Sequence, residues 1–398
     1  MQGLRPAWKE AAWVFGLSRL VILLVSYISV VMVPFFSSGQ SLVGMALNCS
    51  HQPGPCLLAW YHYDAVAYIR IAYQGYSSTP DVAFFPLFPM LIHAGGLLLG
   101  GIFPYSYYAA GLLISNICFY LLLVLLYVLL CQEFEPAITR RALVCLAFYP
   151  YAMFFFAGYT ESLFLLLCLA IFLLLRRGKA VDWWLAGLLG FLAALTRSTG
   201  IVLLVPLLVI YIQRFWLPRE RGQYTWRQRA SALAPLALIP AGLIAYMSYL
   251  DYTKGDFFLV SHVEAAASWH RHLALPGLAF GPAIGTLFTQ SLFSQAFVQN
   301  LLDISFTLIP LAVLVLGWKL VPLHYALFAL GVALFSLSFP QMTEPLASQP
   351  RYMLMLFPIF AIFAFWGKRT RFDLWFLALS LPLFVLNIIL FITHHWVA

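Results

Sequence analysis

Long apolar runs follow one another along nearly the whole chain, separated by shorter polar or basic segments. A helix that crosses a membrane needs roughly 20 predominantly apolar residues, and eleven runs approach that size. We therefore predict an all-α integral membrane protein, a polytopic bundle of about 11 transmembrane helices that forms one domain over residues 1–398. The predicted spans are 12–35, 106–131, 140–157, 161–177, 183–197, 200–217, 230–252, 297–318, 322–338, 351–367 and 372–394.

Residues 83–101 could add a twelfth crossing, but Pro86, Pro89 and two Gly-Gly pairs weaken a straight span there. Charge decides the matter, because Lys and Arg gather in cytoplasmic loops. With eleven crossings, and with 83–101 as a juxtamembrane element, every basic cluster is cytoplasmic, the N-terminus is cytoplasmic and the C-terminus is outside. With twelve, some clusters are misplaced. The clusters are Arg5/Lys9, Arg140/Arg141, Arg176/Arg177/Lys179, the segment 214–229 and Lys368/Arg369/Arg371.

The composition fits this interpretation, since 63% of the residues are hydrophobic and only 9% are charged, against about 25% charged in soluble domains. No separate soluble domain is expected. The first apolar run, residues 11–36, is too long for a signal peptide and lacks a small-residue cleavage site, so we expect a retained first span. The net charge of +8 reflects the charge rule for loops and does not indicate a nucleic-acid partner.

The predicted topology places few charged residues on the extracytoplasmic side. Arg19 is counted as cytoplasmic because it lies in the inner part of the first span. The outer basic residues are Arg70, Arg197, Lys254, Arg271 and Arg351. The outer carboxylates are Asp64, Asp81, Glu161, Asp251, Asp256, Glu264, Asp303 and Glu344. The longest non-spanning stretches, 36–105 and 253–296, are also outside. Extracytoplasmic chemistry must draw on these residues.

Asp64 stands out in the first outer stretch, between Trp60 and Tyr76. Helical spacing there gives an apolar stripe of Ala65, Tyr68, Ile69 and Ala72, which is typical of a helix lying on the membrane surface. Asp64 falls at or near the N-cap of that helix, where a carboxylate stabilises the first turn by about 1 kcal/mol. Capping therefore explains Asp64 without chemistry, although capping and catalysis can coexist.

Several other polar residues lie at outer span ends or in the second outer stretch. Arg197 and Arg351 are flanked by apolar runs, so each must snorkel or bind an anion. A cation at a helix start opposes the helix dipole, so capping does not explain Arg351, whereas anion recognition and interfacial anchoring both do. Further candidates are Glu161 in the turn 159–162, His262 in the segment 261–264, and Trp269 and Arg271 in the segment 269–271.

The cysteines and the spacing of ligand residues add little chemistry. Of six cysteines, four lie in or beside apolar runs, where a thiol behaves as a small hydrophobe. Cys49 and Cys56 share a polar stretch and could pair in an oxidising compartment or remain two thiols; the sequence leaves both open. We predict no metal and no cofactor, because no zinc-type or paired-carboxylate spacing is present.

An ordered set of motifs resembles a known family. Tyr63-Asp64-Ala with Tyr68, Ala83-Phe-Phe-Pro-Leu-Phe-Pro and Tyr159-Thr-Glu-Ser, continuing through Arg197, 269–271 and Arg351, is similar to the second mannosyltransferase of GPI-anchor assembly and its prokaryotic relatives. One departure is Tyr63-Asp64 where the family usually has Trp-Asp, with Trp60 one turn earlier. The resemblance implies a GT-C class membrane glycosyltransferase with surface helices and an acidic catalytic residue in the first outer loop.

The resemblance also implies an enzyme that uses a polyprenyl-phosphate sugar and inverts the anomeric centre. Asp64 would be the general base towards the hydroxyl of a glycolipid, glycan or protein acceptor. Arg197 and Arg351, then Arg271 and Arg70, would bind the lipid phosphate. Glu161 would orient the acceptor or pair with an arginine, and the remaining substrate contacts would be His262, Trp269, Tyr63 and Tyr68.

Two other classes of function remain open from the sequence. A membrane transporter or lipid flippase usually places ionisable residues near the midplane and often shows repeated halves, whereas here the polar residues gather at one interface. A non-catalytic scaffold would present substrate to a partner subunit. Sugar transfer by the isolated chain separates both from an enzyme. The resemblance implies a mannosyltransferase, whereas the residues themselves leave both the sugar and the acceptor open.

Overall fold

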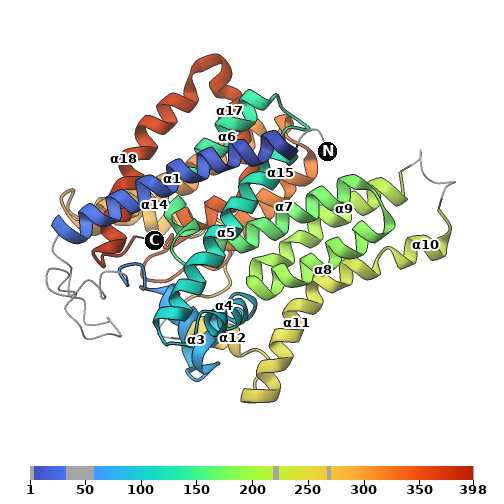
Figure 1. The fold of residues 1–398 in the computed structure, drawn as a ribbon, viewed down its shortest axis with the longest axis horizontal. Coiled ribbons are helices and arrows are strands. Elements are labelled where there is room, and N and C mark those ends of the chain that lie inside the picture. Colours follow the sequence, from blue (N-terminus) through green and yellow to red (C-terminus); the bar gives the residue numbers. More distant parts are fainter. Residues whose placement is uncertain (1–3, 33–57, 218–223, 267–269, 398) are drawn as a thin grey trace. The chain divides into compact units, whose positions relative to one another are not determined.

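The computed structural model describes residues 4–32, 58–217, 224–266 and 270–397, and all the regular elements in these ranges are helices joined by turns and loops. The helix order is shown in Figure 1, and the only strand-like pairing in the described part is an isolated bridge between Arg271 and Gln341. The predicted all-α class is therefore confirmed. Cys49 and Cys56, with their possible disulfide, lie outside the described residues.

The chain divides into two compact units. The first comprises Met1–Ser77, Phe88–Leu163 and Phe363–Ala398. Its helices are α1 (Leu4–Met32), α3 (Asp64–Gln74), nearly all of α4 (Leu87–Leu98), α5 (Tyr105–Leu130), α6 (Pro136–Ala147), η2 (Ala152–Phe155) and α18 (Phe372–Ile392). Helix α1 packs against α5, α6 and α18. The first unit thus brings the two ends of the sequence together around one long span.

The second unit comprises Ser78–Leu87 and Phe164–Ile362. Its elements are η1 (Thr79–Ala83), most of α7 (Glu161–Arg177), α8 (Ala180–Thr196), η3 (Ser198–Leu203), α9 (Leu204–Phe215), α10 (Trp226–Ser231), α11 (Ala234–Lys254), α12 (Leu259–Ala265), α13 (Phe280–Thr289), α14 (Gln295–Gly317), η4 (Trp318–Leu320), α15 (Leu323–Leu337), α16 (Gln349–Tyr352), η5 (Met353–Met355) and the start of α17 (Phe357–Thr370). Its most extensive helix pair is α8 with α11.

Six helices of the described chain are long and apolar enough to cross a membrane, so the protein is a multi-pass membrane protein. They are Arg5–Met32, Tyr105–Leu130, Ser198–Phe215, Trp226–Lys254, Gln295–Leu320 and Phe372–Ile392, and each matches a predicted span. A seventh arises if Gln349–Met355 and Phe357–Lys368, bent by 77°, are one broken span. The count of about eleven is not confirmed and stays a prediction.

The remaining predicted spans correspond to helices that are shorter than those six. The run 140–157 shows most clearly why a helix can end before its apolar run does. There α6 ends at Ala147, two residues before Tyr149-Pro150. Proline lacks an N–H and disfavours helical backbone in the residue before it, so an apolar run continues while the helix stops. The run resumes as the short 3₁₀ helix η2. Residues 83–101 contain α4, a helix of 12 residues that is about 18 Å long and shorter than a bilayer core.

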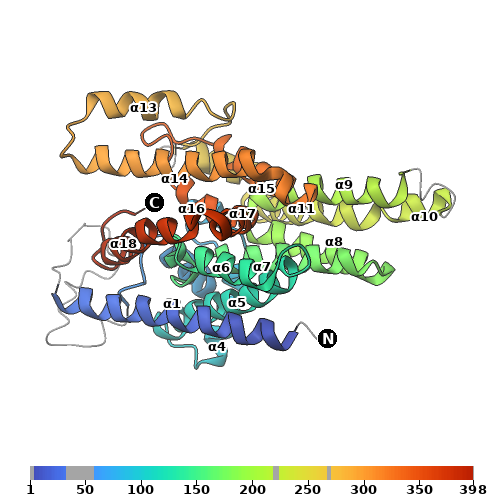
Figure 2. The same ribbon diagram turned by 90° about the horizontal axis from the view of Figure 1, so that it is seen from above.

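Helix α13 and the residues around it are unusually apolar for a stretch predicted to be an outer loop. It packs against α14, as Figure 2 shows, and the Asn300 side-chain amide donates to the carbonyl of Ala283 on α13. No Lys, Arg, Asp or Glu occurs from His272 to Leu302. Phe288 and Phe293, at and just after the end of α13, are 86% and 97% exposed. This part of 253–296 therefore differs from an ordinary polar loop.

Close packing of α8 on α11 depends on glycine, which gives a test of the second unit. A Cβ placed on Gly187 would meet the backbone of Pro235, and Gly242 on α11 similarly approaches the backbone of Phe191. We expect Gly187→Ala to lower the free energy of unfolding by about 1–3 kcal/mol, since overpacking moves backbone. Thermal unfolding followed by tryptophan fluorescence would measure it. Gly16→Ala on α1 is the control, because nothing lies within 4 Å of its Cβ position; equal losses in both variants would contradict the packing argument.

Candidate active site

Asp64 is the first residue of α3, and Tyr63 before it is the N-cap. The predicted stripe of Ala65, Tyr68, Ile69 and Ala72 is buried, so the amphipathic helix and the position of Asp64 near its N-cap are confirmed. Tyr63 has φ 48° and ψ −126°, a conformation that side chains rarely adopt. Such strain persists only where surrounding contacts impose it. The backbone that presents Asp64 is therefore held in place by packing.

The contacts that hold Tyr63 come from the C-terminal end of the same unit. Its ring lies 5.1 Å from the Trp396 ring and 5.8 Å from the Phe391 ring, measured between centroids. Its hydroxyl donates to the carbonyl of His394 at 3.4 Å. Tyr63 is thus a structural support for Asp64, which is a role that the sequence did not predict for it.

Glu161 begins α7 and is fully buried. The preceding turn contains Tyr159, whose hydroxyl donates to the carbonyl of His62 at 3.5 Å and whose carbonyl accepts from Ser115 at 3.0 Å. His62 stands two residues before Asp64, so Tyr159 links the segments that carry both predicted acidic residues. The sequence pattern contained Tyr159 but did not indicate this contact, because the two partners are 97 residues apart.

Tyr68 and Arg70 lie further along α3. The buried Tyr68 ring packs edge-on against Phe88, with centroids 5.2 Å apart, and lies 6.5 Å from the Tyr159 ring. Burial raises the pKa of Tyr61, and the positive charge of Arg70 opposes that rise. Arg70 therefore lies close enough to Tyr61 to interact electrostatically. Tyr68 contributes to the core of the first unit, and its predicted contact with substrate remains untested.

Three predicted arginines converge on one side chain of the second unit. The guanidinium carbons of Arg197 and Arg351 lie 5.1 Å and 5.7 Å from the Tyr352 ring centroid. Arg271 donates from Nη1 to the Tyr352 hydroxyl at 3.2 Å. Arginine stacks on aromatic faces through cation–π attraction. We call Arg197, Arg271, Arg351 and Tyr352 the arginine cluster; Tyr352 is the member that the sequence did not single out.

The backbone around the arginine cluster is also strained and cross-linked. His270 before Arg271 has φ 46°, and Ser348, three residues before Arg351, has φ 65°. The carbonyl of His270 accepts from the Met342 N–H at 3.2 Å, and Ala274 donates to the carbonyl of Ser338 at 2.9 Å. These bonds fix the segment that carries Arg271 against the segment that leads to Arg351.

Glu264 supplies a carboxylate near Arg271. Its carbonyl accepts from the Arg271 N–H at 2.8 Å. Burial raises the pKa of the Glu264 carboxyl, and the positive charge of Arg271 opposes that rise. The Glu264 carboxyl therefore lies close enough to Arg271 to interact with it electrostatically. Guanidinium groups gathered around one tyrosine are suited to binding an anion such as a phosphate.

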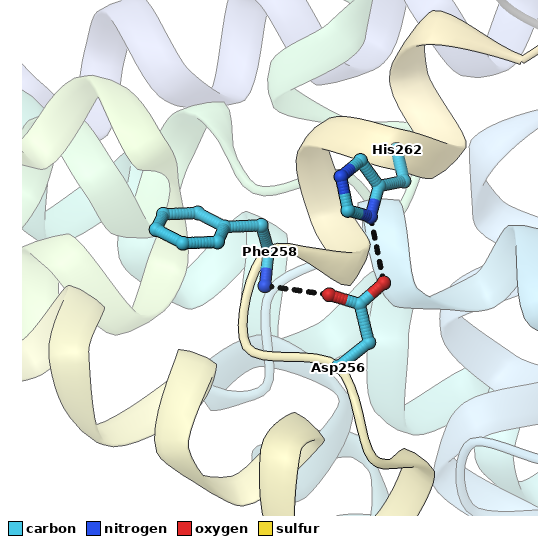
Figure 3. A network of polar contacts seen from close by, with 3 residues as sticks. All are labelled: Asp256, Phe258 and His262. Carbon is cyan, nitrogen blue, oxygen red and sulfur yellow. Dashed lines mark hydrogen bonds and ion pairs between the residues drawn. The ribbon is translucent and has the colours of Figure 1, made fainter.

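His262 has a local partner that explains it without substrate. As Figure 3 shows, its Nδ1 lies 2.6 Å from Oδ2 of Asp256, whose Oδ1 accepts from the Phe258 N–H at 2.9 Å. The hydrogen bond from His262 lowers the pKa of Asp256, and the Phe258 N–H adds to the effect. The pair closes the turn that leads into α12. Trp269 lies outside the described residues.

The structure therefore brings the predicted residues together as two groups. Asp64, Glu161, Tyr63, Tyr68 and Arg70 belong to the first unit, and Arg197, Arg271 and Arg351 belong to the second. Within the described ranges, no group of three or more His, Cys, Asp or Glu side chains could hold a metal ion. The convergence of Asp64 with the arginines stays a prediction.

The buried His62, which stacks on the half-buried His394 near Asp64, predicts acid sensitivity. The rings of His62 and His394 stack with centroids 4.3 Å apart, and burial, with His394 as a second cause, lowers the pKa of His62 to about 3. An unfolded histidine titrates near pH 6.5. As pH falls, the unfolded state binds the proton first, so stabilisation present above about pH 6.5 is lost between about pH 6.5 and 3, at roughly 1 kcal/mol per pH unit.

We therefore expect the unfolding temperature to fall on going from pH 7.5 to pH 5, and His62→Phe to weaken that dependence because an aromatic ring is kept while the titrating group is lost. Differential scanning fluorimetry over pH would measure both. His272→Gln, at an exposed position, is the control. An unchanged pH slope in His62→Phe would contradict the assignment.

Comparison with known proteins gives a family match over more than half of the chain. Residues 24–255 match the model described as Mannosyltransferase (PIG-V). The GPI alpha-1,6-mannosyltransferase 2 of Mus musculus is 30% identical over 204 residues, which cover 48% of this chain and 40% of the mouse protein. The Homo sapiens protein of the same name is 35% identical over 153 residues, covering 35% of this chain and 29% of its own length. The aligned regions thus span less than half of the length of each of these relatives.

Among solved structures, the apo oligosaccharyltransferase of Archaeoglobus fulgidus aligns with a TM-score of 0.43 and 11% sequence identity. The alignment covers 96% of this chain and 56% of that chain. A second structure of the same protein, tethered to an acceptor peptide, aligns with a TM-score of 0.42 and 11% identity.

Proposed function

This chain belongs to the PIG-V mannosyltransferase family, and we propose that it is an inverting GT-C class glycosyltransferase that moves mannose from a polyprenyl-phosphate donor to an acceptor hydroxyl. The reaction takes place on the extracytoplasmic side, in a single domain with a cytoplasmic N-terminus. The acceptor is a glycolipid, glycan or protein hydroxyl. The observation that carries the proposal is the convergence of Arg197, Arg271 and Arg351 on Tyr352.

The arginine cluster suits the leaving group of this reaction. Polyprenyl phosphate gains negative charge as its bond to the sugar breaks, and fixed cations stabilise charge that develops in the transition state. A guanidinium group binds phosphate oxygens through two parallel N–H donors. Stacking on Tyr352 and the bond from Arg271 to its hydroxyl restrict the rotamers of the cluster, which reduces the reorganisation that binding requires.

Asp64 supplies the base in this proposal. The acceptor oxygen attacks the anomeric carbon from the face opposite the phosphate and gives its proton to Asp64, while the bond between the anomeric carbon and the phosphate oxygen breaks. The products are an inverted glycoside, protonated Asp64 and polyprenyl phosphate. Glu161 orients the acceptor or pairs with an arginine. Tyr63 supports Asp64 through its packing on Trp396.

The direct test uses the purified chain in liposomes with a synthetic polyprenyl-phosphate mannose labelled in the sugar. We expect label to appear in an added glycolipid or glycan acceptor, and the product linkage to have the inverted configuration by NMR. A nucleotide sugar as donor is the comparison, and it should give no product. Transfer from the nucleotide sugar alone would reject the donor class. Movement of label across the bilayer without a new bond would instead favour a transporter or flippase.

A further inference from the structure

Arg19 lies in the middle of α1, a candidate span, and is only 7% exposed. Its Nε donates to Oδ1 of Asn116 at 2.8 Å, its Nη2 donates to the carbonyl of Phe155 at 3.1 Å and its Nη1 donates to Ser18 at 3.4 Å. The guanidinium carbon lies 4.2 Å from the Phe119 ring centroid. Within the part of the chain that the structure describes, every acceptor of Arg19 is neutral.

A buried guanidinium without a carboxylate is unusual, because removing a charge from water is costly unless it is paired and hydrogen-bonded. Ionisable residues inside membrane spans commonly mark functional positions. Cytoplasmic charge bias does not account for Arg19, since its side chain is enclosed by the protein. Simple packing does not account for it either, since an aliphatic side chain would fill the space at lower cost. The role that fits Arg19 best is therefore to hold in place the groups to which it donates hydrogen bonds.

Those groups are backbone carbonyls at the end of η2. Phe155 O accepts from Arg19 and also from the hydroxyl of Ser162 at 3.1 Å. Asn116, which accepts from Arg19, donates from Nδ2 to the carbonyl of Phe156 at 3.3 Å. The chain between Phe156 and Ser162 is thus fixed at its beginning by α1 and α5. Gly158 inside it has φ 78°, which allows the sharp turn.

The fixed turn leads directly to the acidic residues of the first unit. It contains Tyr159, which is bonded to Ser115 on α5 and to the carbonyl of His62, and it ends at Glu161. The ring of Trp60, which precedes His62, packs on Phe156 with centroids 4.8 Å apart. A shift of the turn would therefore move Glu161 and the residues immediately before Asp64 together.

We propose that Arg19 is a positioning residue for sugar transfer, which holds the turn 156–161 so that Glu161 and the segment before Asp64 keep their places. This inference rests on the proposed function, in which Asp64 accepts the proton. Arg19 acts through Asn116 and Phe155 and does not touch substrate. Lysine cannot replace it, because its single nitrogen cannot occupy both positions from which Nε and Nη2 donate to Asn116 and Phe155 O.

The test compares Arg19→Lys with Arg140→Lys in the purified protein. Arg140 belongs to the same unit but forms an exposed ion pair with Glu10. We expect Arg19→Lys to lower kcat by about 10–100-fold, as misplacement of a catalytic group by about 1 Å does, with the KM for the polyprenyl-phosphate donor unchanged. Arg140→Lys should leave both constants unchanged. Hydrogen exchange should increase at the amides of 155–161 in Arg19→Lys, while α11 stays protected.

Ser162→Ala provides a second approach, because it removes the other donor to Phe155 O without touching a buried charge. If Arg19→Lys does not fold, Ser162→Ala should still lower kcat at constant KM and increase exchange at 155–161. If Arg19→Lys and Ser162→Ala fold and leave both kcat and hydrogen exchange at 155–161 unchanged, the inference is overturned. It is also overturned if Arg140→Lys loses as much kcat and as much unfolding temperature as they do. An inactive wild type, or full activity of Asp64→Asn, would reject the proposed function instead, and hydrogen exchange at 155–161 would still test whether Arg19 holds the turn 156–161.

Discussion

Replacing Asp64 by asparagine is expected to lower the rate of sugar transfer by about 10²–10⁴-fold, the usual contribution of a general base. Asparagine keeps the size of the side chain and its ability to accept a hydrogen bond, but it does not take the acceptor's proton. The KM for the donor should change little, because the arginine cluster remains. Initial rates at saturating donor, with the labelled acceptor separated and counted, would measure the effect.

Two variants make this result interpretable. Glu135→Gln removes a carboxylate from an exposed pair with Lys368 in the same unit and should leave the rate unchanged. Asp64→Glu keeps the base but moves it along a longer side chain, so we expect partial activity. The unfolding temperature of Asp64→Asn should stay close to that of the wild type, since loss of a first-turn carboxylate costs about 1 kcal/mol or less. Full transfer by folded Asp64→Asn would reject the assignment of the base.

Replacing Arg351 by lysine is expected to lower kcat/KM for the polyprenyl-phosphate donor by about 10²–10³-fold, the usual effect of losing one preorganised donor to a charge that develops in the transition state. The formal charge is kept, so the loss would report the planar, two-donor geometry of arginine. Arg197→Lys should behave similarly, because both groups stack on Tyr352. Steady-state rates over a range of donor concentrations would measure the change, and inhibition by added polyprenyl phosphate should weaken in parallel.

Two further variants separate phosphate binding from folding. Arg177→Lys alters an exposed guanidinium group that pairs with Asp182 in the same unit, keeps its charge and should have no effect. Tyr352→Phe removes the hydroxyl that Arg271 contacts but keeps the ring, so we expect a smaller loss than for either stacked arginine. Unchanged donor kinetics in Arg351→Lys, or unchanged product inhibition, would remove the arginine cluster from the site of the phosphate.

The sequence predicts the long spans and the amphipathic helix α3 well because both depend on local patterns. Twenty apolar residues are recognisable wherever they occur, and the stripe of α3 needs only four residues at helical spacing. Helix ends within apolar runs are harder, since Pro150 stops α6 although the following residues stay apolar. The number of crossings therefore depends on how short helices and bent pairs such as η5 and α17 are placed in a bilayer.

The candidate site is predictable in its charges but not in its supporting contacts. Sorting charges by topology places Arg197, Arg271 and Arg351 among five outer basic residues, yet no local signal connects Arg197 or Arg271 with Tyr352, which lies 81 residues beyond Arg271. For Arg19, the charge rule offers an explanation that hides the contact. By that rule Arg19 is counted as one more cytoplasmic basic residue, whereas its side chain donates to the carbonyl of Phe155, which is 136 residues away. Contacts of this kind arise from the tertiary fold and leave no periodic trace in the chain.

The positive φ angles of Tyr63, His270 and Ser348 have a consequence for the replacement of these residues by glycine. Glycine adopts such angles without a steric penalty, but glycine in place of Tyr63 would lose the ring contacts with Trp396 and Phe391. This chain keeps larger residues just ahead of Asp64 and two of its arginines. A change to glycine at any of these three positions would therefore relieve backbone strain while loosening the segment that carries a proposed functional side chain.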